Sequence, residues 1–211
     1  MKNVVKISIL MATITVAMVF LNGCTKSNDE SEPLVSGSFN GTVTATVDGG
    51  AELYVSVVAA INDTRFNNEN MFLGNIIGNE ANFNNGSFTI TLPTTGLSSY
   101  LEDVTAFFDS FMQAGDKGKL KVSDPSARVM DVDFIGFYVI DEDIYVSGIF
   151  SYATADKATI CVFVYADSDV DITGSANVSV SLKQGWNRVY ISDKLTTNVP
   201  DGMKWYFAYF E

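Results

Sequence analysis

The feature that most constrains the fold is an alternation of apolar and polar residues, which recurs in short runs over most of the chain. In residues 38–47, Phe39, Val43, Ala45 and Val47 fall on one face, and the other face carries asparagine and threonine. A period of two is typical of a strand that is buried on one side only. The sequence therefore predicts β-structure here, with a solvent-exposed threonine face.

Similar segments follow, separated by turns of hairpin length. We expect further strands at 53–61, 71–77, 87–92, 132–140, 144–152, 158–165, 178–182, 187–191 and 203–210. Strands at spacings of roughly ten residues with short turns favour an antiparallel sandwich or barrel over a parallel α/β sheet. The simplest arrangement is one antiparallel β-sandwich, immunoglobulin-like or transthyretin-like, over residues 37–211, and two packed sub-domains are the alternative.

One segment changes period. Apolar residues recur there at spacings of three and four, namely Tyr100, Leu101, Val104, Phe107, Phe108, Phe111 and Met112. This spacing predicts one short amphipathic helix over about residues 99–113, capped by Ser98 or Ser99 and followed by Gly115. We expect its aromatic stripe to cover one end of the sheet core and not to bind a ligand.

The N-terminal 23 residues have the parts of a secretory signal peptide. Lys2 and Lys6 precede an apolar run at 7–21 that is shorter than the roughly 20 residues a membrane-crossing helix needs. The run ends in Leu-Asn-Gly-Cys, which resembles the bacterial lipobox. The resemblance implies that Cys24 receives a diacylglycerol and becomes the N-terminus after cleavage. Two or three acyl chains on one residue anchor a protein stably.

Residues 24–36 are polar and acidic, so we expect a flexible tether that packs against nothing. Thr25 follows the cysteine where an aspartate would suggest retention in the inner membrane. The acidic cluster resembles the surface-export tether of Bacteroidetes lipoproteins. These features predict a protein anchored in the outer membrane by its lipid and exposed at the cell surface.

Composition excludes several classes of function. The chain carries 13 Lys and Arg against 25 Asp and Glu, a formal net charge of −12, and loss of residues 1–23 makes it −14. Such a surface repels nucleic acid. The complete absence of histidine removes Ser-His and Cys-His catalytic pairs and histidine-ligated zinc. With Cys24 lipidated, Cys161 has no intramolecular partner, and its apolar surroundings predict a buried, unreactive thiol.

Two acidic segments have spacings that a metal site could use. Asp167, Asp169 and Asp171 alternate as the first ligands of a calcium loop do. The glycine and the distant glutamate of such a loop are missing, so a polar hairpin tip is the favoured interpretation. The same applies to residues 141–143 (Asp-Glu-Asp). We therefore predict no metal ligands and no cofactor.

Trp186 follows a tight turn, where it could stack on a sugar or fold back to plug the end of the sandwich. We favour the plug. The aromatic segment 205–210 is predicted to be core. The acids show no catalytic spacing, and the chain has neither a glycine-rich phosphate loop nor a Gly-x-Ser-x-Gly elbow. We therefore predict a protein that is not an enzyme.

Several short sequence segments resemble segments that occur together in a known group of proteins. In order along the chain they are residues 41–47, 55–60, 85–93, 100–101, 122–127, 169–174 and 180–187. Together they resemble outer-membrane and surface lipoproteins of gut Bacteroidetes, a group with no established activity. The resemblance implies an anchored β-rich domain and a structural role for Asp169, Asp171 and Trp186. It supplies no catalytic residue.

The sequence thus leads to three functional hypotheses. The first is a non-enzymatic binding module for a glycan or a protein ligand. The second is a structural or accessory subunit of an envelope complex. The third and least favoured is a carboxylate-dependent hydrolase, which would need two carboxylates roughly 5–9 Å apart in a cleft.

Overall fold

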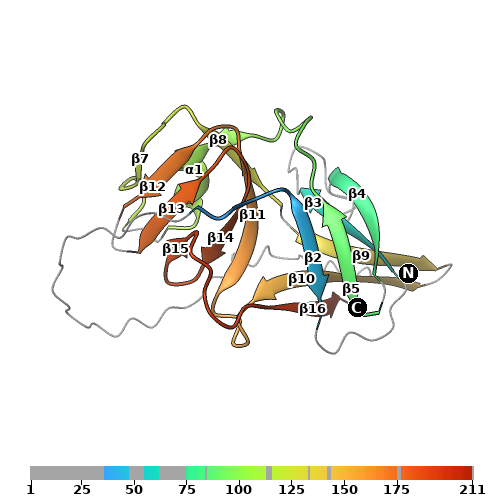
Figure 1. Cartoon of the computed structure of the whole chain (residues 1–211). Coiled ribbons are helices and arrows are strands. Elements are labelled where there is room, and N and C mark those ends of the chain that lie inside the picture. Colours follow the sequence, from blue (N-terminus) through green and yellow to red (C-terminus); the bar gives the residue numbers. More distant parts are fainter. Residues whose placement is uncertain are drawn as a thin grey trace, which may run out of the picture. The chain divides into compact units, whose positions relative to one another are not determined.

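The computed structural model describes residues 36–47, 55–61, 75–83, 85–112, 116–132, 134–141, 144–174 and 177–210 (Figure 1). All of them belong to one compact unit, Pro33–Glu211. The predicted signal peptide, Cys24 and the tether up to residue 35 lie outside the described residues, as do the first residues of the strands predicted at 53 and 71. No helix in the described part of the chain is long and apolar enough to cross a membrane.

The fold is mainly β, with one short helix, as the alternation predicts. The first strands are β1 (Ser38–Phe39), β2 (Thr42–Thr46), β3 (Val55–Ile61), β4 (Asn75–Phe83), β5 (Ser87–Thr91) and β6 (Glu102–Asp103), followed by helix α1 (Val104–Ser110). After the helix come β7 (Lys121–Val122), β8 (Arg128–Asp131), β9 (Phe134–Asp141), β10 (Ile144–Ala153) and β11 (Ile160–Ala166). The last strands are β12 (Val170–Thr173), β13 (Val178–Leu182), β14 (Gly185–Ile191), β15 (Leu195–Thr196) and β16 (Lys204–Phe210).

Most of the strands belong to one large sheet. Its order is β4-β3-β9-β10-β11-β14-β15-β13-β12-β7, with β1 on β14, β16 on β10, and β8 between β11 and β6. Strands β2 and β5 form a separate two-stranded sheet. The named strands pair antiparallel except β13 with β15, so the predicted antiparallel arrangement is confirmed. Strands β6, β7, β8, β12 and β15 were not predicted, whereas β1 falls within the strand predicted over residues 38–47.

Two hydrophobic cores lie on opposite faces of the β11–β14 ladder. The first core comprises Val43, Ala45, Val47, Val57, Ala59, Phe83, Phe88, Ile90, Leu92, Leu97, Met130, Val132, Ile135, Phe150, Phe163, Trp186 and Trp205. The second core comprises Val104, Phe107, Phe108, Ala127, Val129, Val164, Ala166, Val170, Ile172, Val178, Val180, Leu182, Val189 and Leu195. Phe163 and Val164 are neighbours in β11 yet belong to different cores, because side chains alternate across a strand.

The small sheet covers the first core and gives this part of the fold its sandwich-like packing. Val43 pairs with Ile90 and Ala45 with Phe88 across the β2–β5 ladder, and all four side chains are buried. Thr44 and Thr46 are exposed, as the alternation predicts. Each large apolar side chain buried in this way contributes about 1.5–3 kcal/mol.

Helix α1 is shorter than predicted and begins later. Asp103 caps it by accepting a hydrogen bond from the Ala106 backbone N–H at 2.8 Å, so the predicted caps Ser98 and Ser99 are wrong. Residues 102–103 form β6 and pair with β8, and the Arg128 guanidinium donates to the Leu101 carbonyl. These contacts hold the preceding residues in extended backbone, where the apolar spacing alone favours a helix. The helix buries Phe107 and Phe108 in the second core, as expected of a covering helix.

The strand predicted over residues 132–140 begins two residues later in the structure, as β9, and an unpredicted strand, β8, precedes it. Strand β8 ends at Asp131 and pairs with β11, whereas β9 begins at Phe134 and pairs with β3 and β10. The Val132 backbone N–H donates to the Phe163 carbonyl at 3.0 Å, and its side chain is buried in the first core. Strands β8 and β9 therefore follow each other closely along the chain but have different neighbours in the sheet, which periodicity cannot reveal.

Candidate functional site

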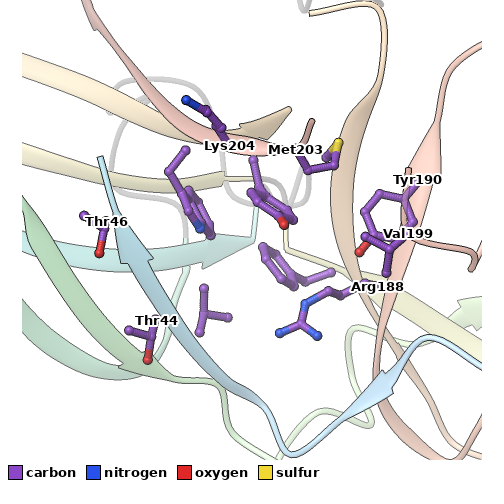
Figure 2. Close-up of a pocket in the computed structure, with 11 residues that line it drawn as sticks. Thr44, Thr46, Arg188, Tyr190, Val199, Met203 and Lys204 are labelled. Carbon is purple, nitrogen blue, oxygen red and sulfur yellow. The ribbon is translucent and has the colours of Figure 1, made fainter. Parts of the chain in front are cut away.

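A cavity of about 470 Å³ lies where β2, β10, β11, β14 and β16 approach one another (Figure 2). It is lined by Val43, Thr44, Thr46, Tyr152, Phe163, Arg188, Tyr190, Val199, Met203, Lys204 and Trp205. Both faces of β2 contribute, Val43 from one and the two threonines from the other, so the cavity runs along the edge of this strand. Its volume falls within the range typical of small-molecule sites, about 300–1,000 Å³.

Strand register places the aromatic and cationic lining residues together. In β14 the face that carries Trp186 also carries Arg188 and Tyr190, since residues two apart share a face. Phe163 of β11 lies directly opposite Arg188. On the other side, Tyr152 of β10 pairs with Trp205 of β16, and their ring centroids are 5.3 Å apart.

The charge of the cavity contrasts with that of the chain. Among the described residues, Arg188 and Lys204 line it and no carboxylate does, although the whole chain carries a net charge of −12. The Arg188 guanidinium carbon lies 4.3 Å from the centroid of the Phe39 ring, a cation–π contact that steadies the side chain. No carboxylate of the described residues forms an ion pair with Arg188. The lining is therefore a cationic, aromatic spot in an acidic protein.

Tyr190 carries a buried hydroxyl with no hydrogen-bond partner among the described residues. Its side chain is 1% exposed. Burial raises the pKa of Tyr190 and Cys161 adds to this effect, while Arg188 opposes it to a smaller extent, so the hydroxyl remains a neutral donor at physiological pH. An unsatisfied buried hydroxyl costs about 1–3 kcal/mol. The buried Tyr190 hydroxyl therefore lowers the stability of the fold.

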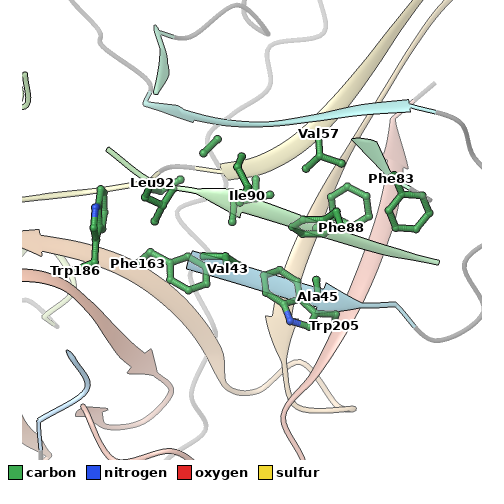
Figure 3. Packing of buried hydrophobic residues seen from close by; sticks show 14 of the residues in the cluster. Val43, Ala45, Val57, Phe83, Phe88, Ile90, Leu92, Phe163, Trp186 and Trp205 are labelled. Carbon is green, nitrogen blue, oxygen red and sulfur yellow. The ribbon is translucent and has the colours of Figure 1, made fainter. Parts of the chain in front are cut away.

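Trp186 lies at one end of the first core, beside Leu92 (Figure 3). It is 1% exposed, and its indole Nε1 donates to the Pro93 carbonyl at 2.7 Å. Its ring meets Tyr165 edge-on, with centroids 5.4 Å apart. The ring is a plug, as favoured from the sequence, and offers no surface on which a sugar could stack.

The three alternating aspartates are not gathered around one point. Asp167 accepts from the Arg128 backbone N–H at 2.9 Å, whereas Asp169 accepts from Lys183 Nζ and from the Gln184 N–H, each at 2.8 Å. The hydrogen bond from Lys183, followed by that from Gln184, lowers the pKa of Asp169. Asp171 lies within β12, a strand that the sequence prediction missed. No group of three or more acidic or cysteine side chains in the described ranges could hold a metal ion.

Two further predicted features have different outcomes. In the acidic turn 141–143, Glu142 and Asp143 lie outside the described residues. Cys161 is partly buried, not fully buried as predicted, and packs against the first core. Burial raises the pKa of its thiol to about 12, with a smaller opposing effect from Arg188. The thiol is therefore protonated at neutral pH.

The cavity residues were not predicted as a site. Residues 187–191 were recognised as a strand, and its alternation puts Arg188 and Tyr190 on the face of Trp186. An arginine on the apolar face of a strand was the one available signal. Thr44, Thr46, Lys204 and Trp205 come from distant segments, and only the tertiary fold brings them together.

Comparison with known proteins adds no functional assignment: no protein-family model, curated protein or solved structure matches the chain.

Proposed function

We propose that the chain is a non-enzymatic binding module, held at the cell surface by a lipid on Cys24, and that its ligand occupies the cavity. The observation that carries the proposal is the composition of the cavity wall. In the described part of the chain, two cations and several aromatic side chains line it and no carboxylate does, in a chain with almost twice as many acids as bases. Concave, mostly apolar cavities with a few polar groups are the usual form of small-molecule sites.

The residues around the cavity favour binding over catalysis. A hydrolase of the carboxylate type needs two acids in its cleft, and none of the acids that the structure describes lines this cavity. The chain has no histidine, and the nearby thiol of Cys161 is held protonated by burial. The described lining therefore offers neither a histidine base nor a thiolate nucleophile.

The size and rim of the cavity favour a small ligand or the end of a glycan. Val199 lines the cavity and is 66% exposed, so it offers apolar contact at the mouth. Among the described residues, the other large exposed apolar side chain is Phe111, at 37%. Its ring contacts Phe107 and Phe108 of helix α1, which line the second core and not the cavity, so the two do not form a patch of the kind that marks a subunit interface.

The proposal is tested by blocking the cavity. The full chain is screened on a glycan array and against water-soluble aromatic compounds, in wild-type form and as Thr46→Trp, whose indole would fill the cavity along β2. Thr42→Trp is the matched control, because Thr42 lies on the same face of β2 outside the cavity. We expect wild type and Thr42→Trp to bind the same ligands and Thr46→Trp to lose them. Equal binding by all three proteins would disprove the location of the site.

A further inference from the structure

We infer that the cavity selects ligands in which a carboxylate stands next to an apolar or aromatic group, with Arg188 and Tyr190 holding the carboxylate. This inference rests on the proposed function and narrows it to a chemical class. It is carried by two observations on one strand face: among the described residues, the Arg188 guanidinium has no ion-pair partner and the Tyr190 hydroxyl has no hydrogen-bond partner.

The spacing of the two donors suits a single ligand group. Arg188 and Tyr190 are two positions apart in β14, so their Cα atoms are separated by roughly 7 Å along one face. Both side chains reach from β14 toward the cavity (Figure 2). Their donors can therefore converge on one oxyanion. A planar guanidinium matches a carboxylate with two parallel hydrogen bonds.

The surroundings of Arg188 leave the guanidinium available. The guanidinium lies over the Phe39 ring, a contact that gives its N–H donors no acceptor. The described acids form no ion pair with the guanidinium. In a chain this acidic, an arginine without a carboxylate partner beside an apolar wall is the natural counter-charge for an anionic ligand. Lys204 adds positive charge to the same lining.

The Tyr190 hydroxyl supplies the second, independent observation. It is a donor without an acceptor, and its oxygen is covered from water in this structure. A ligand reaches it only when a lining residue shifts. Val199, 66% exposed, has the least packing to lose by moving. A carboxylate oxygen would give the hydroxyl the acceptor that the protein does not provide.

Two sources offer this chemistry, a uronic acid unit of a glycan and an aryl carboxylate. The hydroxyls of Thr44 and Thr46 suit the first, and the rings of Tyr152 and Trp205 suit both. The probes are therefore two matched pairs: trigalacturonate with neutral galactotriose, and 3-phenylpropionate with 3-phenylpropionamide. Binding of each to the full chain is measured by isothermal titration calorimetry.

We expect the acid of at least one pair to bind about tenfold or more tightly than its neutral counterpart, since hydrogen bonds to charged groups are the strong ones. Arg188→Gln should abolish that preference, and Arg188→Lys should retain part of it. Lys121→Gln removes the same charge from exposed strand β7, outside the lining, and should change nothing.

Tyr190→Phe separates a binding role from a structural one. Removal of an unsatisfied buried hydroxyl should leave the Tm equal or higher, while acid binding weakens about fivefold or more. A lower Tm with unchanged affinity would show that the hydroxyl serves the fold, and would overturn its part in the inference.

The failures of the two proposals are distinguishable. If acids and neutral partners bind equally, and Thr46→Trp blocks both, the cavity is a binding site and the carboxylate inference is wrong. If neither acid binds, the inference is also overturned, and the array comparison of Thr46→Trp with Thr42→Trp decides the proposed function separately.

Discussion

At the scale of the residue, two buried or partly buried side chains with titratable groups lie on the neighbouring strands β11 and β14. Tyr190 lies directly opposite Cys161 across the β11–β14 ladder, and the pKa values of both side chains are raised by burial. Both groups therefore stay protonated at neutral pH. Of the two, the Tyr190 hydroxyl lacks a partner, while the Cys161 Sγ lies 3.7 Å from the Val162 carbonyl oxygen.

Cys161 should resist alkylation in the folded protein. A pKa of about 12 leaves almost no thiolate near neutral pH, and the thiolate is the reactive form. Because the pKa is raised on folding, the proton also contributes stability that is lost as pH rises from the ordinary cysteine range toward 12. Iodoacetamide labelling followed by mass spectrometry should modify Cys161 slowly in native protein and rapidly in urea. Fast labelling of the native thiol would contradict this.

At the scale of the element, the sequence predicts where strands occur better than it predicts which strands pair with one another. The strand at 178–182 was predicted with its observed bounds, because its alternation is regular and turns flank it. The helix was predicted too long, since the apolar spacing of residues 100–112 does not show that Glu102 and Asp103 pair with β8. The cavity was missed for the same reason: its walls meet through pairings between distant strands, which leave no local pattern.

The cap of α1 should be measurable. Asp103→Ala removes the side chain that accepts from Ala106, and we expect the free energy of unfolding to fall by about 1 kcal/mol. Asp103→Ser should restore most of the loss, because serine is also a good N-cap. Glu102→Ala is the neighbouring exposed control. Chemical denaturation of the four proteins compares them, and an unchanged midpoint for Asp103→Ala would show that strand pairing alone defines the helix start.

The turn before β2 depends on a glycine. Gly41 has a φ of 83°, and a Cβ there would lie 3.0 Å from Cδ1 of Trp186 and 3.2 Å from the Leu92 carbonyl oxygen. Gly41→Ala should therefore combine backbone strain with crowding against the plug, and cost about 1–3 kcal/mol. Gly96→Ala is the control for strain alone, because its φ is 77° and no atom lies within 4 Å of a Cβ built there. An equal decrease in Tm for Gly41→Ala and Gly96→Ala would show that Trp186 moves aside at no energetic cost.

At the scale of the molecule, the β11–β14 ladder is a wall shared by two cores. Arg188 belongs to the cavity side and Val189 to the second core. A slip of one residue would exchange them, placing a charge in an apolar core, so the register is strongly specified. This shared wall is also why the absence of a linker in the sequence could not decide between one sandwich and two packed sub-domains.

Anchoring is a property of the whole chain and has its own test. We predict that the mature protein begins at Cys24 and carries acyl chains there. Metabolic labelling with an alkyne fatty acid should mark the wild type and Cys161→Ala alike, and should not mark Cys24→Ala. Mass analysis of the N-terminal peptide identifies the modified residue. An unlabelled wild type, or a label that persists in Cys24→Ala, would refute lipidation at this position.

The meeting of β2 and β16 has a consequence for the order of events in folding. Val47, at the end of β2, bridges to Trp205 in β16, so the cavity is closed by segments from near the two ends of the described chain. Contacts between such distant segments form slowly, because a long loop must close first. Under the proposal that a ligand occupies this cavity, the site is incomplete until β16 docks. Binding would then report that the final strand has folded into place.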